Sequence, residues 1–325
     1  MLRKRAARKT RGAHSGGREQ KSVATAPQNT EGASDSSRHK LMPEHLLQIL
    51  LLGLVQGAAE LLPVSSSAHV IVVEKLLGLD PSSPEWTFLL VMLHTGTMFA
   101  VIVYFWNAWR RTYFSSGAAF VTIVKQVVLA TVCTAIVGFA LELVIEKVFL
   151  KGGDMETLFS QLPLLGTALL ITGLLIIVSG IREPGPGQGN DLSNPTACLI
   201  GAVQGVCIPF RGLSRSGTTI STGLLAGIGR IRVEVFSFAL AVVITPPAIA
   251  RELWRLIKTH PESTKVSSLV SMALPGIIGM VASFIAGLLA LRLLSRWLET
   301  GRWRLFGVYC IAFAVFVFAL AAFGF

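Results

Sequence analysis

Two short polar segments in this chain carry the side chains best suited to chemistry. The first holds an amide, a carboxylate, three neighbouring hydroxyls and an imidazole: Gln56, Glu60, Ser65, Ser66, Ser67 and His69. Gln56 and Glu60 are four residues apart, so they share one face of a helix that Pro63 must end. The serines then fall at the start of the next helix, where free backbone N–H groups and the helix dipole favour anions. His69 lies one turn further along, on the face of Ser65 and Ser66, so all these groups are predicted to converge.

The second segment has the same form but carries a basic residue in place of the acid. It runs from Gln204 to Thr219 and contains Ser214, Arg215 and Ser216 at a predicted helix start. A guanidinium presented with hydroxyls and backbone amides suits the oxygens of a phosphate group. Arg211 is open to two interpretations, a second phosphate contact or a side chain that reaches the membrane interface. The segment predicts an anion site.

Each of these residues also has a purely structural interpretation. Glu60 and Arg215 could form a buried ion pair without chemistry, the serines could be simple helix caps, and His69 a buried histidine with satisfied hydrogen bonds. Ionisable residues inside a membrane are nevertheless functional by default, and two matched clusters favour function over coincidence. His94 has no comparable neighbours in the sequence and is not expected at the site.

The composition shows what kind of protein must position these groups. Hydrophobic residues make up 52% of the 325, charged residues 14%, and the mean hydropathy is +0.63, whereas soluble proteins are about 25% charged. The chain is therefore predicted to be an integral membrane protein. Its net charge of +11 is concentrated in the first 40 residues, so we expect a membrane and no nucleic acid as its partner. The four cysteines form no C-x-x-C pair, which argues against a zinc site.

The uncharged runs fall into two length classes. Six are long enough, with their flanks, to cross a hydrocarbon core: residues 86–109, 126–141, 162–181, 235–250, 266–291 and 305–325. Two other regions, residues 45–73 and 192–229, are each interrupted by proline, serine and a charge. Short helices joined by a polar break at membrane depth are typical of re-entrant pairs that are buried in protein or line a wet cavity.

The two interrupted regions resemble each other, which indicates an internal repeat. Gly53-Leu-Val-Gln-Gly57 recurs as Gly201-Ala-Val-Gln-Gly205. Three full spans separate the copies, so re-entrant pairs that return to their side of entry would be inserted in opposite senses. The predicted fold is an all-α polytopic membrane protein with about six transmembrane spans and two re-entrant helical hairpins in an inverted-topology repeat.

The predicted domain organisation is a polar tail followed by one membrane domain. Residues 1–41 are expected to be a disordered basic tail, interpreted as an artefact of the assigned start, a surface anchor or a cytoplasmic extension. Residues 42–325 form the membrane domain, with repeat halves at approximately 45–160 and 196–300. A homodimer is left open.

At this point the motifs resemble those of a known family. Gln56-x-x-x-Glu60 followed by Pro63-Val-Ser-Ser-Ser-x-His69, and Ser214-Arg215-Ser216-Gly-x-Thr219, are similar to the two signature motifs of the bacterial undecaprenyl-pyrophosphate phosphatase family, also called the bacitracin-resistance family. The similarity covers residues 42–325. It implies hydrolysis of undecaprenyl pyrophosphate to undecaprenyl phosphate, dependence on a divalent metal, and an active site that faces the periplasm from the bacterial inner membrane.

Two departures from the family pattern stand out. Arg211-Gly212 occupies the place of a Pro-Gly pair, and Gln56 stands where a glutamate is often found. The first leaves the loop geometry and the role of Arg211 open, and the second removes one carboxylate that could bind a metal.

The resemblance and the residue chemistry together suggest a role for each side chain. Arg215, with Ser214, Ser216 and Thr219, is expected to bind phosphate oxygens, and Ser65, Ser67 and Arg211 to contact the substrate. Glu60, assisted by Gln56, is expected to hold Mg²⁺ or Ca²⁺, which prefer oxygen ligands. His69 is expected to act as general acid or base, and Glu60, His69, Ser66 and Arg215 form the predicted catalytic set. The nucleophile stays open between an activated water, Ser66 and His69.

A transporter of lipid phosphates or other anions is the alternative function. Inverted repeats with broken helices at the midplane are also the architecture of secondary transporters. An acid/base set opposite an arginine favours hydrolysis, because transport requires only charge complementarity.

The orientation of the chain is ambiguous from charge alone. Loops on the N-terminal side of the spans carry about six Lys or Arg and the opposite loops nine, so the membrane domain favours an external N-terminus while the basic tail favours an internal one.

Overall fold

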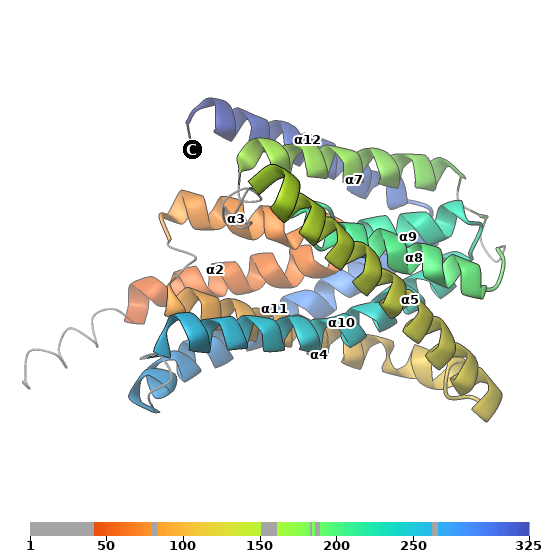
Figure 1. The fold of residues 1–325 in the computed structure, drawn as a ribbon, viewed down its shortest axis with the longest axis horizontal. Helices are drawn as coiled ribbons and strands as arrows, with labels where there is room; N and C mark the ends of the chain where they lie inside the picture. The colour runs from red at the N-terminus through yellow and green to blue at the C-terminus, as the bar shows by residue number, and fades with distance from the viewer. Residues whose placement is uncertain are drawn as a thin grey trace, which may run out of the picture. The chain divides into compact units, whose positions relative to one another are not determined.

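Six helices in the structure are long and apolar enough to cross a membrane, which confirms the number expected from the uncharged runs. The computed structural model describes residues 42–79, 83–150, 161–182, 184–185, 189–261 and 266–324. The six helices are α4 (Pro84–Thr112), α5 (Gly117–Val144, continued by a π-helical turn, Ile145–Leu150), α7 (Leu162–Arg182), α10 (Arg230–Thr259), α11 (Val266–Glu299) and α12 (Trp303–Ala322) (Figure 1). The chain is therefore an all-helical, multi-pass membrane protein. The predicted tail, residues 1–41, lies outside the described residues.

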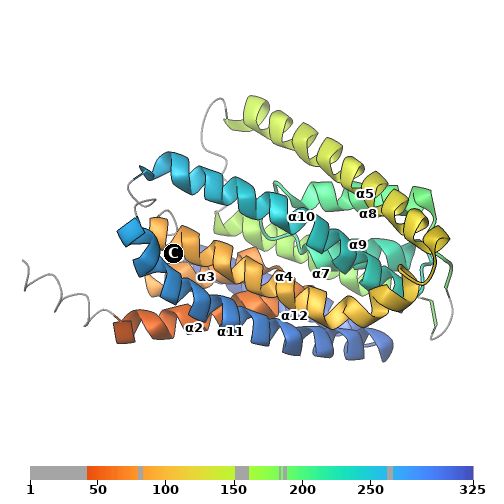
Figure 2. The same cartoon turned by 90° about the horizontal axis from the view of Figure 1, so that it is seen from below.

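Four further helices, which are not among these candidate spans, form two pairs. These are α2 (Met42–Leu61) with α3 (Ser66–Leu77), and α8 (Asn194–Cys207) with α9 (Arg215–Leu225). The pairs come from opposite ends of the helical bundle, and their connecting turns meet in its middle (Figures 1 and 2). Helix α2 ends two residues before Pro63, as expected, and Ser65 and Ser214 are the N-caps of α3 and α9. The polar breaks in the sequence are thus the two turns at the centre.

Glycines let both short pairs approach the long helices closely. A Cβ added at Gly57 of α2 would lie 2.5 Å from the carbonyl oxygen of Ser283 in α11. In the same way, a Cβ at Gly205 of α8 would lie 2.7 Å from the carbonyl oxygen of Thr134 in α5. Small residues four apart permit such backbone contact between membrane helices. The repeated Gly-x-x-x-Gly sequence therefore sets the depth of both central turns.

We expect Gly57→Ala to destabilise the protein by about 1–3 kcal/mol, because its methyl group meets backbone rather than a flexible side chain. Thermal unfolding of the purified protein in detergent measures the change. Gly117→Ala is the matched control, since no described atom lies within 4 Å of a Cβ added there. Equal melting temperatures for the two variants would contradict the close packing of α2 on α11.

Helix α9 is buried although five of its eleven residues are serine or threonine. Its hydroxyls are satisfied inside the protein: Ser221 Oγ lies 2.9 Å from Ser179 Oγ of α7, and Thr219 Oγ1 lies 2.7 Å from Ser237 Oγ of α10. Trp303 Nε1 of α12 also donates to Ser179 Oγ at 3.0 Å. Buried polar groups need such partners, so this network fixes the helix that carries Arg215.

Candidate active site

Glu60 lies in the last turn of α2, and its carboxylate accepts hydrogen bonds from two neighbouring side chains. Ser66 Oγ donates to Glu60 Oε2 at 2.6 Å, and Gln56 Nε2 donates to the same oxygen at 3.2 Å. The i, i+4 spacing on one helix brings Gln56 to the carboxylate, and the turn at Pro63 brings Ser66 back to it. A serine hydroxyl that donates a short hydrogen bond to a carboxylate has the geometry of a nucleophile beside its base.

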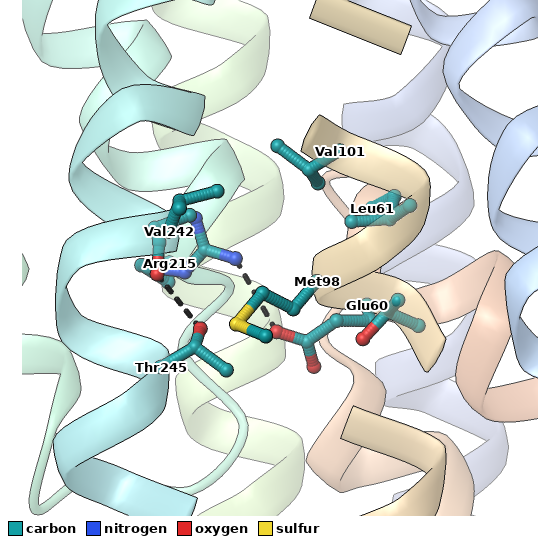
Figure 3. A pocket seen from close by; sticks show the side chains of 9 residues that line it. Glu60, Leu61, Met98, Val101, Arg215, Val242 and Thr245 are labelled. Carbon is teal, nitrogen blue, oxygen red and sulfur yellow. Dashed lines mark hydrogen bonds and ion pairs between the residues drawn. The ribbon is translucent and has the colours of Figure 1, made fainter. Parts of the chain in front are cut away.

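Arg215 is the first residue of α9 and joins the second helix pair to the first. Its Nη2 lies 3.3 Å from Glu60 Oε1, and each side chain is 18% exposed (Figure 3). Its Nη1 is buried and has no hydrogen-bond partner among the residues that the structure describes. Leaving a buried charged donor unsatisfied is costly, so the guanidinium retains a donor that an anion can satisfy.

A small pocket of about 10 Å³ surrounds this ion pair, room for about one water molecule. Its walls come from α2, α4, α9 and α10: Glu60, Leu61, Thr97, Met98, Val101, Arg215, Ala241, Val242 and Thr245. Three of the four elements thus lie outside the segment that carries the first motif. The site is a contact between distant segments and not a property of either motif alone.

The two N-cap serines hold the helix starts. Ser65 Oγ accepts a hydrogen bond from the backbone N–H of Ala68 at 3.4 Å, and Ser214 Oγ accepts from Gly217 N–H at 3.2 Å. Ser65 also has φ 69° and ψ 97°, the left-handed region that only glycine adopts freely. Strain of this kind costs about 1–3 kcal/mol and gathers at functional sites. It turns the chain sharply enough to aim Ser66 at Glu60.

The remaining serines and threonine of the motifs play different structural parts. Ser216 Oγ donates to the Leu62 carbonyl at 3.2 Å and so ties the two central turns together. Thr219 Oγ1 donates to the Arg215 carbonyl at 2.7 Å. Ser67 and Arg211 are exposed. Of the predicted residues, the structure brings Gln56, Glu60, Ser66 and Arg215 into direct contact.

His69 does not join this cluster in the structure. Its Nδ1 lies 2.8 Å from the Ser65 carbonyl, its Nε2 lies 2.7 Å from Tyr309 Oη, and its ring stacks on Phe313 with centroids 4.0 Å apart. Tyr309 and Phe313 are four residues apart on α12, so they present one aromatic face to the imidazole. The proton-transfer role of His69 stays a prediction, and in this conformation the ring is directed to α12.

His94 of α4 is the histidine that faces Glu60, and the sequence did not single it out. Its Nε2 lies 3.9 Å from Glu60 Oε2, and its Nδ1 lies 2.8 Å from the Leu90 carbonyl, which fixes the ring. The general expectation that ionisable residues inside a spanning helix are functional applies to His94 as well. The position of His94 within an apolar run could have identified it from the sequence, whereas its contact with Glu60 of α2 could not be predicted.

A metal in this site could not rely on protein carboxylates alone. Within the described part of the chain, no group of three or more His, Cys, Asp or Glu side chains is placed to hold an ion. The oxygen donors at hand are Glu60, the Ser66 hydroxyl and, after a half-turn of its amide, Gln56. Mg²⁺ is often bound by one or two carboxylates together with substrate phosphates, and this donor set fits that mode.

Comparison with known proteins places the chain in a family. Residues 49–316 match the family described as bacitracin resistance protein BacA, a range that contains every residue of the cluster. The chain belongs to the BacA family. Undecaprenyl-diphosphatase 2 of Acinetobacter baylyi is 54% identical over 281 residues, which cover 85% of this chain and 98% of that protein.

More distant relatives of this BacA-family chain carry the same kind of name. The undecaprenyl-diphosphatase of Desulfosudis oleivorans is 32% identical, covering 81% of this chain and 94% of the relative. That of Korarchaeum cryptofilum is 30% identical, covering 85% of this chain and 99% of the relative. The resemblance stated from the two motifs is therefore confirmed over most of the chain.

Proposed function

We propose that this BacA-family chain is a membrane phosphatase that hydrolyses undecaprenyl diphosphate to undecaprenyl phosphate and inorganic phosphate. The relatives named above are undecaprenyl-diphosphatases, at up to 54% identity. The observation that carries the proposal is the arrangement of Ser66, Glu60 and Arg215, in which one carboxylate contacts both a hydroxyl and a guanidinium. Through this reaction the enzyme would recycle the lipid carrier of cell-wall synthesis, in keeping with the bacitracin resistance for which its family is named.

Arg215 binds the diphosphate in this mechanism. Its unpartnered Nη1 donates to a phosphate oxygen first, and Nη2 moves from Glu60 Oε1 to a second oxygen. A bidentate guanidinium then stabilises the negative charge that grows as the P–O bond breaks. The N-terminus of α9 adds backbone dipoles of the same sign.

Glu60, once Arg215 has turned to the substrate, acts as the general base. It accepts a proton from Ser66 or from a water that occupies the same position, while the lipid phosphate departs as an anion. If Ser66 attacks the terminal phosphorus, a phosphoserine forms, and Glu60 then releases its proton to solvent. Glu60 next takes a proton from the water that attacks the phosphoserine and returns it to the Ser66 oxygen as inorganic phosphate leaves. His69 would take part as a proton donor only after its ring turns away from Tyr309.

Glu60 and Gln56 are also the residues that would hold Mg²⁺ or Ca²⁺, together with diphosphate oxygens. When bound, the ion would neutralise charge on the substrate as a Lewis acid. The oxygen donors described above support this assignment.

We expect a chelator such as EDTA to abolish phosphate release, and added Mg²⁺ or Ca²⁺ to restore it. Release is measured on the purified protein with a polyprenyl diphosphate. A lipid phosphatase of another family that uses no metal, assayed in the same detergent, serves as the control. Full activity in excess chelator would leave Glu60 with a proton-transfer role only.

Contacts between the helices support an inverted-topology repeat with two re-entrant hairpins. Helix α2 belongs to the first half and packs on α11 of the second half. Helix α8 belongs to the second half and packs on α5 of the first half. These two contacts are equivalent by position in the two halves, as a two-fold relation between the halves predicts. The midpoints of α4 and α10 both lie at the pocket, which supports placing the two turns at membrane mid-depth.

Charge distribution supports a periplasmic active site in the bacterial inner membrane. Arg110 and Arg111 end α4, and Arg230 and Arg232 begin α10, so this end of the bundle is rich in arginine, as cytoplasmic ends are. The same end is closed by aromatic packing between Phe105 and Phe238. The site would then open toward the opposite, periplasmic side. A homodimer stays a prediction.

The decisive experiment is release of inorganic phosphate from undecaprenyl diphosphate by the purified protein. The proposal expects stoichiometric release in detergent, without a membrane gradient. Movement of the intact lipid across vesicles without release would instead support the transporter alternative, which the relatives do not favour.

A further inference from the structure

The pocket that holds the ion pair lies far from either end of the spanning helices. Met98 is the fifteenth of the 29 residues of α4, and Thr245 is the sixteenth of the 30 residues of α10. At a rise of about 1.5 Å per residue, each lies roughly 20 Å from the helix ends. A long apolar chain attached to a diphosphate at this depth must pass sideways into the hydrocarbon.

The lining of the pocket indicates which wall the chain can cross. Leu61, Thr97 and Ala241 are each at most 3% exposed, so the walls that they form are closed. The half-buried lining residues other than the ion pair are Met98 of α4 and Val242 and Thr245 of α10. Met98 lies across the ion pair in Figure 3, facing the two α10 side chains. Apart from the ion pair, the partly exposed lining of the pocket therefore comes from α4 and α10.

Aromatic packing closes the seam between α4 and α10 on one side of the pocket. Toward the arginine-rich end, the rings of Phe105 and Phe238 are 5.0 Å apart, and Trp109 Nε1 donates to the Val235 carbonyl at 3.2 Å. In the other direction, α10 continues with Pro246 and Pro247, both exposed. An opening would begin at the pocket and extend away from the aromatic contacts.

Helix α10 is also weakened at this wall. Prolines have no N–H, so the carbonyls of Val242 and Val243 lose their helical donors at Pro246 and Pro247. Such positions are where helices bend. Methionine on the opposite side is unbranched and adapts to irregular spaces. The backbone of α10 and the side chain of Met98 can thus both move without the loss of further helical hydrogen bonds.

We propose that the prenyl chain of the lipid diphosphate leaves the active site between α4 and α10, with Met98, Val242 and Thr245 against its first isoprene units. The proposal rests on the function proposed above and names the part of the molecule that recognises the lipid. It makes the α4–α10 seam a specificity site for long apolar chains, distinct from the polar groups that bind the diphosphate.

Substitution at the seam tests the proposal by its dependence on chain length. We expect Val242→Trp to lower kcat/KM for undecaprenyl diphosphate by a factor at least about ten times larger than its effect on kcat/KM for methyl diphosphate, which has no isoprene unit to place at the seam. Val243→Trp is the matched control, because Val243 is 42% exposed and does not line the pocket. Equal losses on both substrates, or equal losses in both variants, would overturn the assignment.

Photolabelling separates this proposal from the proposed hydrolysis. A methylene-bridged, non-hydrolysable diphosphonate lipid with a diazirine on its second isoprene unit should label peptides that contain Met98 or Val242. Labelling confined to other helices would refute the seam. A wild-type protein that is labelled at the seam yet releases no phosphate from the natural lipid would refute hydrolysis and leave the seam standing.

Discussion

Replacing Glu60 with glutamine is expected to lower phosphate release by roughly 10²- to 10⁴-fold, the usual contribution of a general base. Glutamine keeps the size of the side chain and can still accept from Ser66, which donates to Glu60 Oε2 at 2.6 Å. It cannot take up the proton of a nucleophile, and it removes the negative charge opposite Arg215. The measurement is initial-rate phosphate release at saturating undecaprenyl diphosphate.

A second buried carboxylate provides a close control for this substitution. Glu234 is 3% exposed and accepts from Ser295 Oγ at 2.5 Å, so it repeats the carboxylate–serine contact outside the site. Glu234→Gln should retain activity within about threefold. Near-normal hydrolysis by Glu60→Gln would remove Glu60 from both the base and the metal-binding assignments.

Replacing Arg215 with lysine is expected to lower phosphate release at least about tenfold although the positive charge is kept. The guanidinium reaches Glu60 with Nη2 while Nη1 stays buried and without a partner among the described residues. Two donors in a fixed fork can bind two phosphate oxygens, whereas an ammonium binds as a point charge. Lipid binding, measured separately by a filter or fluorescence assay, should persist.

Arg251→Lys is the matched control, because it also replaces a guanidinium by an ammonium in an ion pair but does so at an exposed position. Arg251 lies 3.4 Å from Glu142, nearly the distance of the Arg215–Glu60 pair, but its side chain is 73% exposed. Exposed pairs contribute little, so Arg251→Lys should be close to wild type. If Arg215→Lys hydrolyses normally, the fork is not used, and a transporter that needs only a positive site becomes the better description.

Local rules predicted the helix ends of this site well. The end of α2 before Pro63 and the caps at Ser65 and Ser214 follow from proline chemistry and side-chain capping, which act over a few residues. The pairing of Gln56 with Glu60 follows from helical spacing in the same way. The six spans followed from apolar run length. These features depend on the chain near each residue and therefore appear in its sequence.

Features that depend on distant segments could not be predicted. His69 and His94 both lie in apolar helices, and only the packing of α4 against α2 and of α12 against α3 decides which one faces Glu60. The strained φ of Ser65 is likewise imposed by the fold. Gly57 and Gly205 were read as marks of a repeat, and only the structure shows that they are contact points for α11 and α5.

The exchange of short helices between the two halves has a consequence for how the protein is made. Glu60 and its partner Arg215 are 155 residues apart, and α2 packs on α11, which is made later still. At a synthesis rate of about 5–20 residues per second, the carboxylate waits about 8–30 s before its counter-ion leaves the ribosome. The first short pair therefore cannot complete its packing until the second half has been translated. Formation of the Glu60–Arg215 contact is thus a late event in the making of the protein.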